Sequence, residues 1–278
     1  MPITDTLRKR LITTGMLVPV AVLSVLFLPT PLFALLMGFI VCLGAWEWSN
    51  FVGLTARSGR IGFTCFVAAC LATLWFLLPR AWDPYLLAVA TIWWLVLALV
   101  LWRIDRISTV LGAQPTLIPV GLLVLLAPWL GIVALHGVAD TGPWMVLSLF
   151  MLIWIADSAA YFAGRRWGRR KLAPVLSPGK TLAGLYGGLA GAAIWGLVLV
   201  FSFELAPKSG VLLILVCAFA ALLSVVGDLF ESLLKRQRGL KDSGSLLPGH
   251  GGVLDRIDSM TAAAPIFALG MLWLENAL

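Results

Sequence analysis

Four aspartates stand near the ends of long apolar segments, where an ionised side chain is costly. Asp157 lies about five residues, or about 8 Å of helix, inside the apolar segment that precedes Arg165. Asp228 closes a second such segment, and Asp255 and Asp258 open a third. If these carboxylates converge, they cannot all stay ionised without compensating charge. A hard divalent cation such as Mg²⁺, which takes oxygen ligands, would supply that charge.

Basic residues follow the same segments. Lys235, Arg236 and Lys241 come after the second segment, and Arg256 separates the two late aspartates. Ammonium and guanidinium groups bind phosphate well, so the cluster as a whole predicts a phosphate-binding site. Arg238 taken alone is explained as well by membrane topology with charge pairing along a helix as by phosphate binding.

The segment Ser177–Thr181 (SPGKT) invites comparison with a nucleotide-binding P-loop. The pattern G-x-x-x-x-G-K-[ST] requires a glycine where this chain has Pro174, so we exclude a P-loop. Ser177, Lys180 and Thr181 can still present two hydroxyls and an ammonium to phosphate, because the start of the next helix favours anions. Four glycines at small-x-x-x-small spacing follow, which favours helix packing over a nucleotide loop: Gly184, Gly187, Gly188 and Gly191.

Two further polar residues give weaker signals. His250 stands between glycines in PGHGG (248–252), where the backbone is free to approach a ligand closely. A single loop histidine is more often a hydrogen-bonding residue than a metal ligand or a base. Glu47 lies between Trp46 and Trp48 at the end of an apolar segment, and we interpret it as an interfacial residue that snorkels to water.

The composition indicates an integral membrane protein. The chain of 278 residues is 61% hydrophobic and 12% charged, and its mean hydropathy is +1.00, whereas soluble domains are about 25% charged. A transmembrane helix needs about 20 mainly apolar residues. Nine candidate segments cover residues 11–28, 32–48, 61–78, 85–102, 117–135, 144–162, 182–203, 211–230 and 257–274. We therefore predict an all-α polytopic membrane protein with about nine transmembrane helices.

The basic residues predict an orientation. When the loops are assigned alternately to the two sides, 18 of the 20 Lys and Arg residues fall on one side, and Arg80 and Lys208 fall on the other. The positive-inside rule then predicts a cytoplasmic N-terminus and an external C-terminus. We expect an N-terminal membrane region of about five helices (1–140) and a C-terminal catalytic region of about four (141–278). Topology and anionic lipids explain the net charge of +7, so we expect no nucleic-acid partner.

At these residues the chain resembles the bacterial-type phosphatidate cytidylyltransferases, also called CDP-diacylglycerol synthases. The family's late signature is a serine, a basic pair, Lys-Asp, His-Gly-Gly and Asp-Arg-hydrophobic-Asp. This chain has Ser232, Lys235-Arg236, Lys241-Asp242, His250-Gly251-Gly252 and Asp255-Arg256-Ile257-Asp258, in matching order and spacing. The segment from Asp157 to Thr181 is similar to a second family block, although many relatives have an acidic residue where this chain has Ala183. The resemblance is motif-specific over residues 154–260.

The resemblance implies transfer of a cytidylyl group from CTP to phosphatidic acid, which gives CDP-diacylglycerol and pyrophosphate for phospholipid biosynthesis. It also implies Mg²⁺ as cofactor, with a second metal ion left open, and a homodimer. The expected location is the bacterial cytoplasmic (inner) membrane, multi-pass and surrounded by membrane lipids, with the active site facing the cytoplasm.

The resemblance also implies a role for each matching residue. The catalytic set is Asp228, Asp255, Asp258 and Lys235. The metal ligands are Asp228, Asp255, Asp258 and Asp157. The substrate-binding residues are Ser177, Lys180, Thr181, Ser232, Arg236, Lys241, Asp242, His250 and Arg256.

Two alternative functions remain open at this point. A CTP-dependent polyprenol or phytol kinase would use a similar metal and phosphate site but would transfer the γ-phosphoryl group. A membrane anion transporter would instead line a path with these charges. The charges all lie near one interface, whereas transporter sites usually lie near the bilayer midplane.

Overall fold

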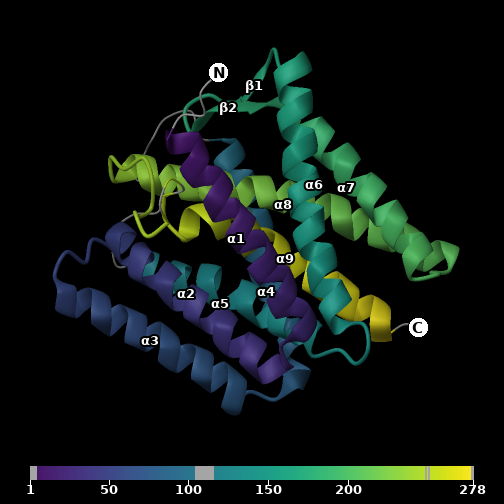
Figure 1. Ribbon diagram of the computed structural model, residues 1–278, viewed down its shortest axis with the longest axis horizontal. Helices are drawn as coiled ribbons and strands as arrows, with labels where there is room; N and C mark the ends of the chain where they lie inside the picture. Colours follow the sequence, from purple (N-terminus) through teal and green to yellow (C-terminus); the bar gives the residue numbers. More distant parts are fainter. Residues whose placement is uncertain (1–4, 104–115, 248, 250, 277–278) are drawn as a thin grey trace.

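A computed structural model describes residues 5–103, 116–247, 249 and 251–276. Within these residues it contains nine α-helices, one 3₁₀ turn (η1, Arg80–Trp82) and one β-hairpin (Figure 1). The helices are α1 (Asp5–Phe27), α2 (Thr30–Val52), α3 (Arg57–Phe76), α4 (Asp83–Trp102), α5 (Leu117–His136), α6 (Gly142–Trp167), α7 (Leu182–Ser202), α8 (Pro207–Gln237) and α9 (Leu254–Asn276). The strands are β1 (Lys171–Ala173) and β2 (Ser177–Thr181).

The helices form along the apolar segments and begin or end at local signals. Helices α2, α4, α6 and α8 carry a proline in their first turn, where the missing N–H costs no intrahelical hydrogen bond. Helix α2 ends at Gly53, whose φ of 85° is a left-handed geometry that favours glycine.

Eight of the described helices, α2 to α9, are long and apolar enough to cross a membrane. In α1 the described apolar stretch, Gly15–Phe27, is shorter. The prediction of an all-α polytopic membrane protein is confirmed. The count of nine spans and the orientation of the termini stay predictions.

Helix α9 packs against α8, α5 and α4 in the middle of the molecule. Its side chains Ala262, Ala263, Ala264 and Phe267 are fully buried. The small residues let neighbouring helices approach, because a Cβ added at Gly131 of α5 would lie 3.0 Å from the Cβ of Ala268. Helix α9 therefore contacts helices from both predicted regions, and the division at residue 140 stays a prediction.

Helices α6 and α7 pack closely through small residues. A Cβ added at Gly187 would clash with the Cβ of Ala163, and one added at Gly191 would lie 2.9 Å from the Cβ of Ala159. Membrane helices commonly approach each other through such small side chains. The predicted packing role of these glycines is confirmed, and their contacts fix α6 against α7 near the hairpin that joins them.

The β-hairpin adds a feature that the all-α prediction omitted. Its two strands pair antiparallel, with Lys171 opposite Thr181 and Ala173 opposite Ser177. In Figure 1 the hairpin, the start of α1 and the loop between α8 and α9 lie toward one end of the helix assembly, and the end of α9 lies at the other. The predicted site residues fall at the hairpin end.

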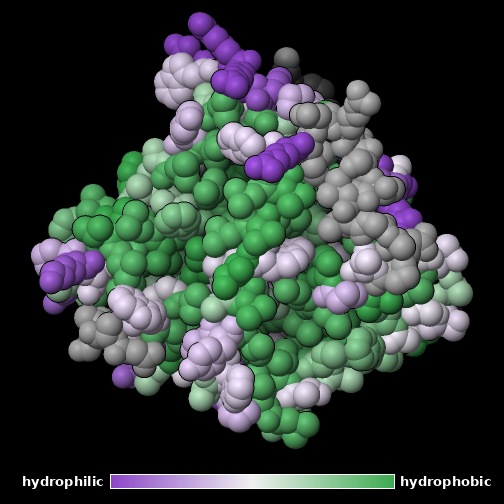
Figure 2. Space-filling view, turned by 180° about the vertical axis from the view of Figure 1, so that it is seen from behind, coloured by the Kyte–Doolittle hydropathy of each residue, from purple (hydrophilic) through white to green (hydrophobic). Residues whose placement is uncertain are grey.

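The surface between the two ends is strongly apolar. Figure 2 shows hydrophobic residues over most of one face, with most of the strongly hydrophilic residues toward its margins. Phe76, Trp102 and Phe201 are 73 to 78% exposed, which would be unfavourable in water. Such a surface is suited to contact with lipid acyl chains.

Candidate active site

Lys180 is the centre of an acidic cluster at the hairpin end. Its ammonium lies 2.7 Å from the Oδ2 atom of Asp228 on α8. The charge of Lys180 also acts on Asp157 of α6 and Asp258 of α9. We call these four residues the Lys180 cluster. Of the four aspartates singled out in the sequence, Asp228 thus pairs with Lys180, and Asp157 and Asp258 are near enough to interact with its charge.

The hairpin and α7 hold Lys180 in place. The next residue, Thr181, is buried, and its Oγ1 accepts a hydrogen bond of 3.1 Å from the N–H of Gly184, which caps the start of α7. The Lys180 ammonium also donates to the carbonyl of Val225 on α8 at 3.5 Å. The Thr181 hydroxyl was predicted as a phosphate contact, and it already serves the helix as a cap.

Helices α8 and α9 touch beside the Lys180 cluster. A Cβ added at Gly227, next to Asp228, would clash with the carbonyl oxygen of Asp258. The absence of a side chain at this position allows the two helices to cross closely. Gly227 therefore sets the separation between these two aspartates.

Three cavities meet this region. The first, about 450 Å³, is lined by Asp157, Lys180 and Asp228, with the basic residues Arg165 and Lys171 also on its wall. A second, about 360 Å³, lies between α1, α6 and α9 and also contains Asp157 on its wall, together with Asp255, Arg256 and Asp258. The third, about 660 Å³, lies between α4, the hairpin, α7 and α8 and is mainly apolar, with Arg170 and Lys171 in its lining.

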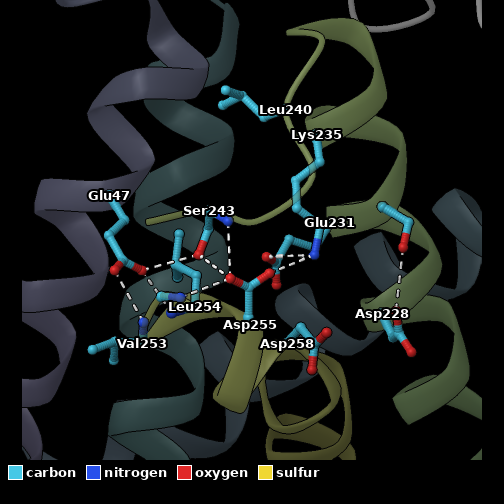
Figure 3. Close-up of polar contacts among 12 residues, drawn as sticks. Glu47, Asp228, Glu231, Lys235, Leu240, Ser243, Val253, Leu254, Asp255 and Asp258 are labelled. Carbon is cyan, nitrogen blue, oxygen red and sulfur yellow. Dashed lines mark hydrogen bonds and ion pairs between the residues drawn. The ribbon is translucent and has the colours of Figure 1, made fainter. Parts of the chain in front are cut away.

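A second ion-paired group surrounds Lys235, one turn beyond Glu231 on α8 (Figure 3). The Lys235 ammonium lies 2.6 Å from Oδ1 of Asp255 and 3.2 Å from Oε1 of Glu231. Asp255 Oδ2 accepts hydrogen bonds of 2.9 Å from the N–H of Gly252, and from both the N–H and the hydroxyl of Ser243. Both oxygens of Asp255 therefore have partners within the chain.

Glu47 corrects the interpretation made from the sequence. It is 1% exposed and does not reach a polar interface. Its Oε1 accepts a hydrogen bond of 3.0 Å from the N–H of Val253, and its Oε2 accepts bonds of 2.8 Å from the N–H of Leu254 and 3.1 Å from the hydroxyl of Ser243 (Figure 3). The carboxylate turns inward because these three donors replace its hydration shell.

Several predicted basic and polar residues lie at the edge of these groups. Ser232 donates a hydrogen bond of 3.3 Å to Asp228 Oδ1. Arg236 is exposed and donates to the carbonyl of Leu240. Arg256 is exposed on the first turn of α9. Lys241 and Asp242 are exposed on the loop between α8 and α9, and half-buried Ser177 starts β2. His250 lies outside the described residues. Arg238 donates to the carbonyl of Phe51 on α2, which gives it a structural role.

The carboxylate oxygens near the two lysines are of the type that a hard cation binds, and they outnumber the lysine charges. Five carboxylates, those of Asp157, Asp228, Glu231, Asp255 and Asp258, share two lysines, Lys180 and Lys235. In the part of the chain that the structure describes, no three acidic, His or Cys side chains stand close enough together to hold a metal ion without rearrangement. Mg²⁺ commonly uses only one or two carboxylates and completes its shell with water and substrate phosphate.

Comparison with known proteins identifies the family of this chain. The sequence profile of the cytidylyltransferase family matches residues 8–274. The chain belongs to the cytidylyltransferase family. Among relatives, it is 39% identical to the phosphatidate cytidylyltransferase of Pseudomonas aeruginosa over 96% of this chain and 97% of the relative. It is also 39% identical to the phosphatidate cytidylyltransferase of Haemophilus influenzae, over 94% of this chain and 97% of the relative.

The cytidylyltransferase match spans both the late signature and the N-terminal helices. It includes two polar residues whose roles the sequence reasoning missed, Glu47 and Ser243. The signal for Glu47 was present, since it is an acidic residue enclosed by apolar residues on a predicted span. Ser243 had no comparable signal, because its buried position is visible only in the folded loop.

Proposed function

We propose that this protein transfers the cytidylyl group of CTP to phosphatidate. Membership of the cytidylyltransferase family and two full-length relatives named phosphatidate cytidylyltransferase support the reaction class. The observation that carries the proposal is the placement of Lys180, Asp157 and Asp228 on the wall of a cavity with basic residues, directly beside a large apolar cavity. A substrate with a phosphate headgroup and acyl chains matches that pair of cavities.

The triphosphate of CTP would occupy the cavity of about 450 Å³. Lys180, Arg165 and Lys171 would bind its phosphate oxygens, because their cationic groups line the same wall. The side chain of Lys180 is 24% exposed, so its ammonium can hold a phosphate without leaving Asp228. Exposed Arg236, Lys241 and Arg256 would attract the nucleotide from solution.

Asp228, Asp258 and Asp157 would hold Mg²⁺. Asp255 is the weakest candidate among the four predicted ligands, because it would first have to release Lys235 or a backbone N–H. When bound, Mg²⁺ neutralises charge on the triphosphate and makes the α-phosphorus more electrophilic. Positioning and charge stabilisation of this kind supply most of the catalysis in phosphoryl transfer generally.

The lipid would enter with its acyl chains in the apolar cavity of about 660 Å³. Lys171 lines both this cavity and the nucleotide cavity, so it would guide the lipid phosphate toward the α-phosphate of CTP. An oxygen of the lipid phosphate would then form a bond to the α-phosphorus. The bond between that phosphorus and the β-phosphate oxygen breaks, and pyrophosphate leaves.

The proposed location is the bacterial cytoplasmic (inner) membrane, with the hairpin end facing the cytoplasm and with two copies of the chain forming a homodimer. The distribution of Lys and Arg residues supports this orientation. A C-terminal alkaline phosphatase fusion should be active and a cytoplasmic reporter at the same position inactive. The reverse pattern would exclude the combination of a cytoplasmic N-terminus with nine spans.

The position of a radioactive label tests the reaction. With Mg²⁺, phosphatidate and CTP labelled at the α-phosphate, the purified protein should place label in the lipid product and release unlabelled pyrophosphate. Label that reaches lipid only from the γ-position would identify a CTP-dependent lipid kinase instead. No label in lipid from either position would contradict both enzyme assignments and return attention to an anion transporter.

A further inference from the structure

Glu47 is a buried carboxylate of α2 that the proposed reaction does not yet use. We infer that Glu47 is a positioning residue for cytidylyl transfer, acting on Asp255 through Ser243 and through the start of α9. Asp255 in turn holds Lys235. This inference rests on the proposed function, and it assigns a role in the reaction to a helix that carries none of the predicted site residues.

Glu47 caps α9 from another helix. Its two carboxylate oxygens accept hydrogen bonds from the N–H groups of Val253, at 3.0 Å, and Leu254, at 2.8 Å. The first N–H groups of a helix have no intrahelical partner, and the helix dipole favours a negative charge beside them. Because Asp255 follows directly, its backbone position depends on the contact between α2 and α9.

Ser243 connects the carboxylates of Glu47 and Asp255. Its hydroxyl lies 3.1 Å from Glu47 Oε2 and 2.9 Å from Asp255 Oδ2 (Figure 3). A serine hydroxyl has one proton, so these two carboxylates compete for a single donor. A change at Glu47 therefore alters the hydrogen bonding of Asp255. Because Asp255 Oδ1 contacts Lys235, the same change also shifts that ion pair.

Two glycines leave room for the Glu47 carboxylate. A Cβ added at Gly244 would clash with Glu47 Oε1, and one added at Gly252 would lie 2.5 Å from Glu47 Oε2 and would clash with the hydroxyl of Ser243. The loop between α8 and α9 thus folds directly around this side chain. A larger residue at position 244 or 252 would therefore displace the Glu47 carboxylate.

The variants Glu47→Gln and Glu47→Asp separate a positioning role from a general structural role. Glutamine has the same shape, but its NH₂ group would face a backbone N–H, so one donor loses its acceptor. We expect Glu47→Gln to lower kcat roughly ten- to hundredfold, the effect of a small misplacement of catalytic groups. The KM for CTP should stay within about threefold, because Glu47 contacts no substrate. Glu47→Asp keeps the charge and should recover part of kcat.

Three controls make the result decisive. Cys42→Ala, on the same helix, should keep kcat within about twofold. The folded fraction of each variant is measured by size-exclusion chromatography, so that kcat refers to folded enzyme. In the double variant with Ser243→Ala, the combined loss should be smaller than the product of the two single losses, because both changes break one linked network.

Hydrogen exchange provides a readout that needs no activity. In Glu47→Gln one of the amides of Val253 and Leu254 should exchange at least about tenfold faster than in the wild type, since glutamine keeps only one accepting oxygen. Wild-type kcat in folded Glu47→Gln, unchanged amide exchange, or losses that multiply independently with Ser243→Ala would each overturn the inference. An inactive wild type would instead contradict the proposed function, and the exchange measurement would still test the contact itself.

Discussion

Two lysines of this protein form ion pairs of nearly equal length in very different surroundings. The Lys180 ammonium lies 2.7 Å from Asp228, and their side chains are 24% and 33% exposed on a cavity wall. The Lys235 ammonium lies 2.6 Å from Asp255, with exposures of 11% and 5%, and it also contacts Glu231. The first pair is accessible to a ligand, whereas the second is enclosed by protein.

The difference in exposure indicates that the two ion pairs have different roles, one in substrate binding and one in structural stability. A partly exposed pair contributes only about 0 to 1 kcal/mol, so substrate phosphate can share or replace it at little cost. Removing one partner of a buried pair costs about 3 to 5 kcal/mol, because the other charge is left uncompensated. We therefore expect the Lys180 cluster to bind and the Lys235 group to hold the loop and α9 in place.

Removal of Mg²⁺ should have the largest effect on activity and almost none on folding. Chelation with EDTA should reduce product formation to background, and added Mg²⁺ should restore it, because the proposed reaction needs charge neutralisation at the Lys180 cluster. The thermal unfolding midpoint should fall only slightly, because a weakly bound ion adds little to the stability of the native state. Full activity in EDTA would show that the reaction does not require Mg²⁺.

Asp228→Asn should lower product formation by roughly 10³-fold, because one change removes a proposed metal ligand and the charge that holds Lys180. Radiolabelled lipid product is the measurement. Asp83→Asn provides a matched control, since Asp83 is also a buried acidic residue paired with a cation, Arg80, at 3.6 Å. It should keep activity within about twofold, and a similar loss in both variants would contradict the assignment.

Lys180→Met and Lys235→Met compare the two groups directly. Lys180→Met should lower kcat/KM for CTP roughly 10²-fold with little change in stability, because its pair is partly exposed. Lys235→Met should lower the unfolding free energy by about 3 to 5 kcal/mol, because Glu231 and Asp255 lose their counterion. Thermal unfolding and initial rates on folded protein measure both effects. Equal destabilisation by the two variants would contradict the assignment of a binding role to Lys180 and a structural role to Lys235.

Gly227→Ala should have the smallest of these effects, a loss of about tenfold in kcat. The added methyl group would meet the carbonyl of Asp258 and widen the crossing of α8 and α9 beside the Lys180 cluster. Gly62→Ala on α3 is the control, because a Cβ there meets no atom within 4 Å. If both variants keep wild-type rates, the separation of Asp228 and Asp258 does not limit catalysis.

The helices were predictable because the apolar segments of this chain are long and interrupted by prolines, glycines or charges. The predicted segments at 85–102, 117–135 and 182–203 match α4, α5 and α7 closely. The eighth predicted apolar segment ends at Phe230, and helix α8 continues beyond it to Gln237. A charged final stretch lowers the hydropathy, although it extends the same helix and places Glu231 and Lys235 on it.

The candidate site was predictable where function depends on residue type and not where it depends on distant contacts. The gathering of Asp157, Asp228 and Asp258 follows from helix ends that share one side. The hairpin was missed because its strands are short, and Pro174 and Pro178 weaken any strand pattern. The role of Glu47 depends on partners that are 196 to 207 residues away, which local patterns do not reveal.

The contact between Glu47 and the start of α9 also sets an order of assembly. Leu254 follows Glu47 by 207 residues, so at typical synthesis rates the carboxylate waits roughly 10 to 40 s for its partners. During that interval α2 has already been made, and its acidic side chain has neither the Ser243 hydroxyl nor the amides of α9. The site is therefore completed only when α9 leaves the ribosome and enters the bundle. A nascent chain that stalls before this point would lack the three hydrogen-bond donors that the folded chain supplies to Glu47.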